Sequence, residues 1–411
     1  MTTIERILQA AVDRSAEIKQ LLTRAEEIAP TLVARQAETE ARGYYAEDTH
    51  EAFKAAGFYR ALVPPEFGGL GVDLETFGRI VMAIARGCPG SAWQLCLGAS
   101  HTINVCQLFD TSLWPEIFAD SNFIAPLPAR PSGEIRQLDN GDWSLTGTYS
   151  YSSGLPYASH LISQAMPVYR DGSKGPPIVF LARRSDWTML DDWHDAFGMK
   201  GSGSFSARFD DARIPDRFVL RAGLLDFQPK PLEKDKPSLR SNPAYYGAFE
   251  GFFLYELAAL GVGAVTGALD EYANLIRTKP TIWPPISQRL ENDDYLRWYG
   301  RALGRLAMAE AALTNLAQQW TESGRRRMLG EPPVSEAENL RMMLLGGEVI
   351  DIVWEIMQTL WTTMGTSPAQ NGQRMQRVFR DVAMLRNHGV AADFDNRARQ
   401  LAAQVLGKPA A

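Results

Sequence analysis

Apolar residues in the first part of the chain recur at helical intervals. One predicted helical face carries apolar side chains three or four positions apart: Ile18, Leu21, Leu22, Ala25 and Ile28. The segment 63–71 breaks this pattern, because its two prolines lack N–H donors and its three glycines permit positive φ. The sequence therefore predicts a helical domain over 1–121, interrupted by a loop at 63–71.

Between residues 122 and 220 the hydrophobic period changes to two, which is typical of strands. Residues 143–151 alternate apolar and polar side chains, and Asn140-Gly141 just before them is a strong hairpin-turn signal. Apolar runs at 178–182 and 206–209 predict further strands. The middle of the chain is therefore expected to be a β-domain.

The segment 221–245 contains four prolines and the charged run 233–236, so it is expected to be a linker or lid. Helical periodicity then returns and predicts a helical bundle over 246–411. Ser335 and Glu338 make a capping-box helix start. One apolar stripe of this bundle is predicted to be buried: Leu303, Leu306, Leu313, Leu316 and Trp320.

Composition narrows the class of protein. The 411 residues carry 42 Lys+Arg and 48 Asp+Glu, a formal charge of -6, so no global positive field favours nucleic acid or an anionic membrane as a partner. No window reaches the ~18 consecutive apolar residues of a membrane span, and the N-terminus lacks the apolar core of a signal peptide. We expect a cytoplasmic protein.

Two glycine-rich stretches bear on nucleotide binding. The glycines between Gly261 and Gly267 have the wrong spacing for a dinucleotide-binding motif, and they predict close approach of helices instead. The run 201–204 (Gly-Ser-Gly-Ser) lies between an aromatic stretch and a strand. It is interpreted either as a plain turn or as a cradle for a cofactor phosphate or ring edge.

Five histidines are the candidates for proton transfer near neutral pH. His50, His160 and His194 are expected at the surface. His101 could face a cavity or be a core residue, and spacing alone leaves His388 undecided. No metal site is expected, because the sequence has no clustered Cys/His ligand pattern, and no G-x-S-x-G elbow supports a serine hydrolase.

The order of helices, strands and helices resembles the acyl-CoA dehydrogenase fold over nearly the whole chain. The resemblance rests on five short segments in family-like order: 64–71, 147–154, 198–204, Ile214-Pro215 and Arg380-Asp381. It implies an α+β fold with an N-terminal helical domain, a central β-domain and a C-terminal helical bundle.

The dehydrogenases of this family need a carboxylate base, commonly a Glu followed by Gly a short distance beyond the Arg-Asp pair. Here that position holds Gly389, preceded by His388. A minority of the family places the base on the first helix of the last domain, where Glu256 is the nearest match. In carrying an imidazole near the place of this carboxylate, the sequence resembles the two-component flavin-dependent monooxygenases built on the same fold.

That resemblance implies a reaction and its components. A separate flavin reductase would supply FMNH2 or FADH2, O2 would form a C4a-hydroperoxyflavin, and one oxygen would pass to a small aromatic, a phenol or heteroaromatic. His388, as a base for the phenolic proton, and Ser153, beside flavin N5, are the expected catalytic residues. Substrate contacts are expected from His101, Trp93, Phe123 and His388, and flavin contacts from Ser152, Ser153, Trp193, Ser202, Gly203 and Ser204.

Two alternatives stay open: an acyl-CoA dehydrogenase using Glu256, and a catalytically inactive flavin-binding homologue, since fold alone does not establish activity. The resemblance also implies a homotetramer formed through the last domain. Apolar helix residues offered for that interface are Leu344, Ile350, Val353 and Ile356.

Overall fold

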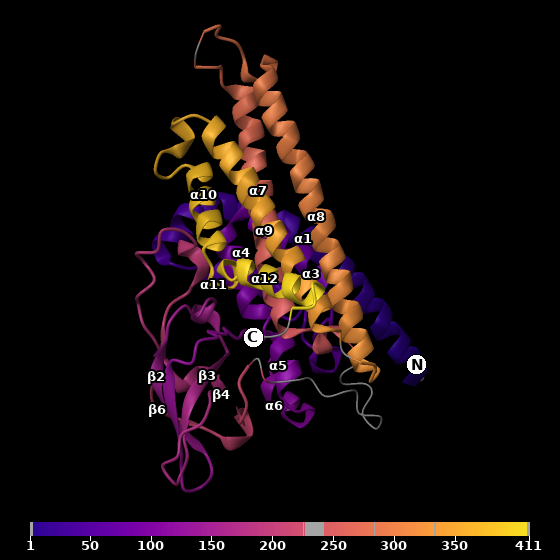
Figure 1. The fold of residues 1–411 in the computed structure, drawn as a ribbon, viewed down its shortest axis with the longest axis vertical. Coiled ribbons are helices and arrows are strands. Elements are labelled where there is room, and N and C mark those ends of the chain that lie inside the picture. The colour runs from indigo at the N-terminus through magenta and orange to yellow at the C-terminus, as the bar shows by residue number, and fades with distance from the viewer. Residues whose placement is uncertain (1–2, 225, 227–241, 283, 333, 409–411) are drawn as a thin grey trace.

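The computed structural model describes residues 3–224, 226, 242–282, 284–332 and 334–408. Most of the expected linker, 225 and 227–241, lies outside the described residues. The chain runs through helices, then a sheet, then a second set of long helices (Figure 1). This is the α+β order expected from the sequence, and that expectation is confirmed.

Helices α1 and α4 pack against α3, which supplies a core face of this region. Asp73 caps α3 by accepting a 2.7 Å hydrogen bond from Thr76 N. Phe77, Val81 and Ile84 of α3 are buried, as their helical spacing requires. The helices span these residues: α1 Thr3–Arg42, α2 Glu47–Ala56, α3 Leu74–Gly87, α4 Pro89–Ala99, α5 Thr102–Leu108 and α6 Trp114–Ile117.

The described strands form one seven-stranded sheet in the order β5-β6-β2-β1-β3-β4-β7. The predicted hairpin joins antiparallel β1 and β2, with Gly141 in its turn at φ 94°. Trp143, Leu145 and Tyr149 of β2 are buried on one face, as alternation predicted. The strands span β1 Gly133–Gln137, β2 Trp143–Tyr149, β3 His160–Val168, β4 Ile178–Arg183, β5 Thr188–Met189, β6 Ala207–Ile214 and β7 Val219–Leu220.

The long C-terminal helices stand beside α1 and α3 at the end of the molecule away from the sheet (Figure 1). The capping box is present, because Glu338 N donates to Ser335 Oγ while Ser335 N donates to Glu338 Oε2. Leu303 is 42% exposed, so its place in the predicted buried stripe was wrong. The helices span α7 Phe249–Thr278, α8 Asp293–Met328, α9 Glu336–Thr363, α10 Arg374–Arg386, α11 Gly389–Ala392 and α12 Phe394–Val405.

Helix α7 is the one helix among the described residues that is long and apolar enough to cross a membrane by length and composition. In residues 251–278, 89% of the apolar window is buried inside the protein. A Cβ on Gly263 would lie 2.3 Å from Met82 O, and one on Gly267 would lie 2.4 Å from Arg86 O. The glycines therefore let α3 approach α7, and α7 is a core helix.

Three of the four residues offered for a tetramer interface lie inside the chain, and the fourth, Leu344, is half-buried. Ile350, Val353 and Ile356 of α9 are at most 1% exposed. They pack in the hydrophobic core, so choosing them as surface residues was wrong. A helix with apolar residues on more than one side is buried among its neighbours rather than left with a free face.

Candidate functional site

The candidate site lies where α4 meets the turn after β2. Trp93 is on α4 and is 6% exposed, while Ser153 follows β2 and is 8% exposed. Trp93 Nε1 donates a hydrogen bond of 2.9 Å to Ser153 Oγ. A hydrogen bond therefore connects Trp93, expected to contact the substrate, with Ser153, expected to contact the flavin.

Ser153 also ends a chain of three buried hydroxyls. Its Oγ is 2.8 Å from Ser204 Oγ, which is 2.6 Å from Ser202 Oγ. Gly203, between the two, has φ 59° and supports the tight turn that brings both serines to one side. Ser152 differs, because its hydroxyl donates to Tyr149 O within its own turn at 2.9 Å.

The Arg380–Asp381 pair of α10 anchors the loop that leads to these serines. Met199 N donates to Asp381 Oδ1 at 2.6 Å, and Arg380 Nη1 donates to Phe197 O at 2.9 Å. A Cβ on Gly198 would lie 2.1 Å from Arg380 O, so only glycine permits this approach. Burial raises the pKa of Asp381 to about 7, against the lowering effect of the Met199 N–H.

Trp193 is held by the same loop. Its Nε1 donates to Met199 O at 3.2 Å, and its half-buried ring meets Tyr151 edge-on with centroids 5.5 Å apart. Tyr151 is 70% exposed and has φ 59°. Trp193 is thus fixed to the loop that leads to Ser202 and Ser204, and an indole offers a face on which a planar ring can stack.

His388 reaches the site from the segment between α10 and α11. Its imidazole meets Trp93 edge-on with centroids 5.5 Å apart. Burial lowers its pKa below the ordinary value of 6.5, so the ring is neutral at neutral pH. Three predicted residues therefore come together: Trp93, Ser153 and His388.

His101 is buried beside α7. It is 2% exposed, its Nδ1 lies 2.8 Å from Ala125 O, and burial lowers its pKa to about 4. Its ring centroid lies 6.3 Å from that of Phe253 on α7. Phe123, by contrast, packs in an aromatic group with Phe118 and His160.

Glu256, one turn along α7 from Phe253, is turned toward α4. It is 1% exposed, and neither carboxyl oxygen has a hydrogen-bond partner in the part of the chain that the structure describes. Burial raises its pKa to about 8 despite the neighbouring Ser100 hydroxyl. It is therefore a neutral core acid at neutral pH, and Phe253 is the α7 residue that meets His101.

A flavin fits the residues that are present. Gln94 is 1% exposed, and its Nε2 is a buried donor that lacks a partner among the described residues. A Cβ on Gly203 would lie 3.2 Å from Gln94 Cδ, which places this amide against the serine loop. An unpaired amide N–H, serine hydroxyls and an indole face suit a planar ring with carbonyl acceptors.

Gln94 and Phe253 were missed from the sequence. Both lie on apolar helices whose buried faces cannot be ranked by periodicity alone. His50 and His160, which were expected at the surface, are half-buried. His50 stacks on Tyr157 with centroids 4.0 Å apart, and burial lowers the pKa of His160 to about 4. His194 is exposed, as expected.

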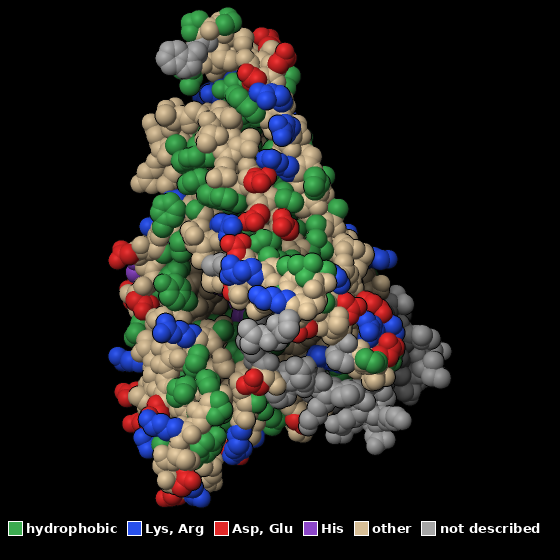
Figure 2. Space-filling model, in the orientation of Figure 1, with side chains coloured by type: hydrophobic (Ala, Val, Ile, Leu, Met, Phe, Trp, Pro, Cys, Tyr) green, Lys and Arg blue, Asp and Glu red, His purple; other side chains and the backbone are tan. Residues whose placement is uncertain are grey.

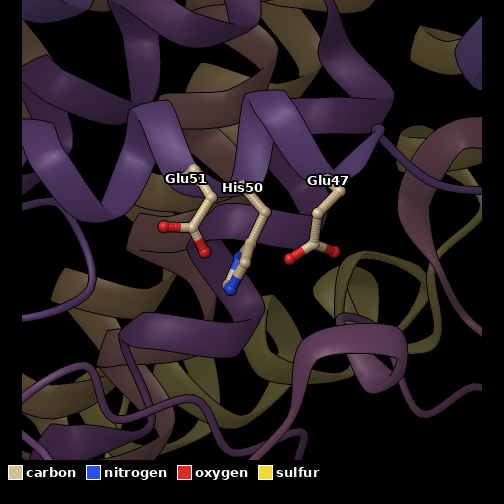
Figure 3. A group of neighbouring side chains, drawn as sticks. All are labelled: Glu47, His50 and Glu51. Carbon is tan, nitrogen blue, oxygen red and sulfur yellow. The ribbon is translucent and has the colours of Figure 1, made fainter.

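One group of side chains on α2 has metal-ligand spacing within the described residues: Glu47, His50 and Glu51 (Figure 3). Glu51 already pairs with Lys54 at 2.9 Å, and His50 Nδ1 lies 2.9 Å from Tyr59 Oη. Both glutamates are exposed, and exposed acidic groups are common without a metal. The group shares no residue with the candidate site.

Family models match both helical parts of the chain. The acyl-CoA dehydrogenase N-terminal domain matches residues 15–109, and the acyl-CoA dehydrogenase C-terminal domain matches residues 255–392. Together they cover more than half of the chain.

Known proteins are similar over nearly the full length. A pigment production hydroxylase from a Rhodococcus species is 27% identical, covering 95% of this chain and 97% of the relative. The oxygenase component of p-hydroxyphenylacetate 3-hydroxylase from Acinetobacter baumannii is 22% identical, covering 94% and 88%. The solved structure of XiaF from a Streptomyces species, in complex with FADH2 and glycerol, has a TM-score of 0.85 at 18% identity, covering 97% of each chain.

Proposed function

The chain belongs to the acyl-CoA dehydrogenase family, among its flavin-dependent monooxygenases, and we propose that it is the oxygenase component of a two-component system. It uses reduced flavin, FMNH2 or FADH2, and O2 to hydroxylate a small aromatic compound, a phenol or heteroaromatic. A separate flavin reductase supplies the cofactor.

The observation that carries this proposal is the set of contacts around Trp93. The Trp93 indole binds Ser153 through its N–H and packs against His388 through its ring. The resemblance implies that this histidine stands next to Gly389, the position where dehydrogenases of the family commonly carry their carboxylate base. An imidazole and a hydroxyl in a largely buried aromatic site suit oxygen transfer better than removal of a proton from a thioester.

The flavin, when bound, supplies the electrons that activate O2 for transfer of one oxygen atom to the aromatic ring. The protein's part is to hold the flavin ring beside the substrate and to keep water away from both. Ser153 and Ser204 offer hydroxyls and Gln94 offers an unpaired N–H. Trp193 offers an aromatic face anchored at Met199 O.

The substrate is proposed to lie beside Trp93, His388 and His101. Trp93 and His101 are almost fully buried, and the Phe253 ring packs against His101. Exclusion of water strengthens hydrogen bonds inside such a site and suppresses loss of the activated oxygen as peroxide. The face in Figure 2 is hollowed where the sheet meets the C-terminal helices.

The proposal is tested by reconstitution. The protein, a flavin reductase, NADH and FMN or FAD are combined with a panel of phenols, indoles and thioethers under ¹⁸O2. Hydroxylated product containing ¹⁸O, in amounts that depend on the protein, is the expected result. Release of hydrogen peroxide alone with every aromatic would refute the proposed activity.

The dehydrogenase alternative has its own readout in the same preparation. An acyl-CoA would bleach bound oxidised flavin if Glu256 acted as a base. We expect no bleaching, because Glu256 is neutral and a protonated carboxyl cannot accept a proton. An inactive homologue would give neither bleaching nor product.

Assembly and location complete the proposal. A homotetramer is proposed, with α8 as the contact in place of the buried α9 residues, because Leu296, Leu303 and Met308 of α8 are 42–63% exposed. We also propose a cytoplasmic location.

Nucleic acid and membranes are not proposed as partners, since charges of both signs are interspersed on the face shown in Figure 2.

A further inference from the structure

We propose that His388 acts as a hydrogen-bond donor through Nε2, and not as the proton-accepting base that the sequence suggests. The inference deepens the proposed function and rests on it for its catalytic meaning. It also names the substrate class: aromatic compounds that present an oxygen lone pair to the histidine, as a phenolate or a ring carbonyl does.

The tautomer follows from the start of α11. Val390 N–H donates to His388 Nδ1 at 3.4 Å, which makes His388 the N-cap of that helix. A backbone N–H can only donate, so Nδ1 must present its lone pair. A neutral imidazole has one protonated nitrogen, and here it is Nε2.

The neutral state follows from burial. The ring packs against Trp93, and its desolvation disfavours the charged form. A protonated ring would also place an N–H at Nδ1 against the Val390 N–H. The neutral Nε2–H form therefore satisfies both contacts.

This arrangement leaves no free lone pair on His388 for a substrate proton. The lone pair that a base needs is at Nδ1 and is engaged by the backbone. His101 shows the opposite pattern, because its Nδ1 must donate to Ala125 O and its neutral ring keeps the lone pair on Nε2. The two histidines are thus not interchangeable.

The Nε2–H donor of His388 determines which substrates the site prefers. An Nε2–H donates to the oxygen of a neutral phenol, which keeps its own proton, and the bond is worth more for substrate that enters already ionised, because a hydrogen bond to a charged group is stronger. The N–H of an indole and the sulfur of a thioether offer poor acceptors. Phenols are therefore the preferred substrates of this site.

The tautomer is measured first, in the flavin-free protein. The chain is labelled with ¹⁵N-histidine, and the His388→Asn spectrum assigns the missing signals. At neutral pH the His388 Nδ1 shift should be that of an unprotonated nitrogen and the Nε2 shift that of a protonated one. A proton on Nδ1 would overturn the proposal, whether or not the enzyme hydroxylates anything.

Three variants then distinguish the possible functions of His388: hydrogen-bond donor, general base and helix cap. His388→Gln keeps an amide N–H near the Nε2 position but cannot act as a base. His388→Asn keeps a cap for Val390 N–H but has no group at Nε2. His388→Leu removes both functions.

The expected result with a phenol is kcat/KM for His388→Gln within about tenfold of wild type, while Asn and Leu lose roughly 10- to 100-fold. Flavin affinity should be unchanged in all three variants. Equal, large losses for Gln and Leu would identify a base and refute the donor role. If no variant and no wild type yields product while the Nε2–H tautomer is observed, the proposed function fails and the tautomer stands.

Discussion

The indole N–H of Trp93 donates a 2.9 Å hydrogen bond to Ser153 Oγ, while the edge of the same ring system lies against His388 with centroids 5.5 Å apart. One side chain thereby sets the positions of the two polar residues expected to face the flavin and the substrate. Trp93 was expected only to line the substrate pocket, and the structure adds this positioning contact.

Trp93→Phe should uncouple oxygen use from hydroxylation. Phenylalanine retains an aromatic ring near His388 but leaves the Ser153 hydroxyl without its donor, at a cost of about 1 kcal/mol in positioning. The measurement is product formed per O2 consumed, which we expect to fall several-fold. Trp187→Phe is the matched control, because Trp187 is 5% exposed and its Nε1 has no hydrogen-bond partner among the residues that the structure describes. Equal uncoupling in both variants would contradict the role of the Trp93 N–H.

Ser153→Ala should raise the rate of hydrogen peroxide release. The variant removes the hydroxyl that ends the chain of buried serines and leaves Ser204 with one partner fewer. Peroxide is measured beside product at saturating reduced flavin. Ser152→Ala is the control, since the Ser152 hydroxyl is bonded to Tyr149 O, and stronger uncoupling by Ser152→Ala would transfer the role to that residue.

Arg380→Leu should destabilise the protein and weaken flavin binding together. The Arg380 side chain is 10% exposed and binds both Glu40 and Phe197 O, at the loop that carries Met199. Removing one partner of a buried ion pair costs about 3 kcal/mol or more, measured by urea unfolding. Arg377→Leu leaves the Arg380–Glu40 pair in place, so flavin affinity should be lost in Arg380→Leu alone.

Glu256→Gln should remove a pH dependence of stability. Burial raises the pKa of Glu256 from 4.5 to about 8, so between these values the folded protein binds a proton that the unfolded chain has lost. The contribution of Glu256 to stability therefore falls as pH rises through this range, by up to about 1.4 kcal/mol per pH unit.

The Glu256→Gln variant is neutral at every pH, so its unfolding free energy should be flatter than wild type over the same range. Glu66→Gln, at an exposed position, is the control and should preserve the wild-type slope. A wild-type slope in Glu256→Gln would show that the carboxyl is ionised in the folded state.

Leu303→Lys combined with Met308→Lys should dissociate the proposed tetramer. Both side chains are exposed on α8, and charges there oppose burial in an interface. The mass is measured by light scattering, with circular dichroism to show that the fold is kept. A tetramer that survives the double substitution would exclude these two positions of α8 from the contact.

The sequence alone determined the features that depend on neighbours along the chain. The change of period between helix and strand, the Asn140-Gly141 hairpin and the Ser335–Glu338 capping box all appear as expected. Each is decided by backbone conformation and side chains within a few residues, so the local pattern carries the full information. The spacing of Gly261 to Gly267 likewise predicted close helix packing correctly.

Only the tertiary structure decided which side chains meet. Trp93 and Ser153 lie far apart in the chain, and their hydrogen bond depends on how α4 is placed against the turn after β2. On α7 a turn of the helix separates Phe253 from Glu256, and the rotation set by packing against α3 and α4 turns Phe253, not Glu256, toward His101. Hydrophobic periodicity identifies a buried helix but does not assign its faces when most of its surface is covered, which is why Phe253 was not identified from the sequence.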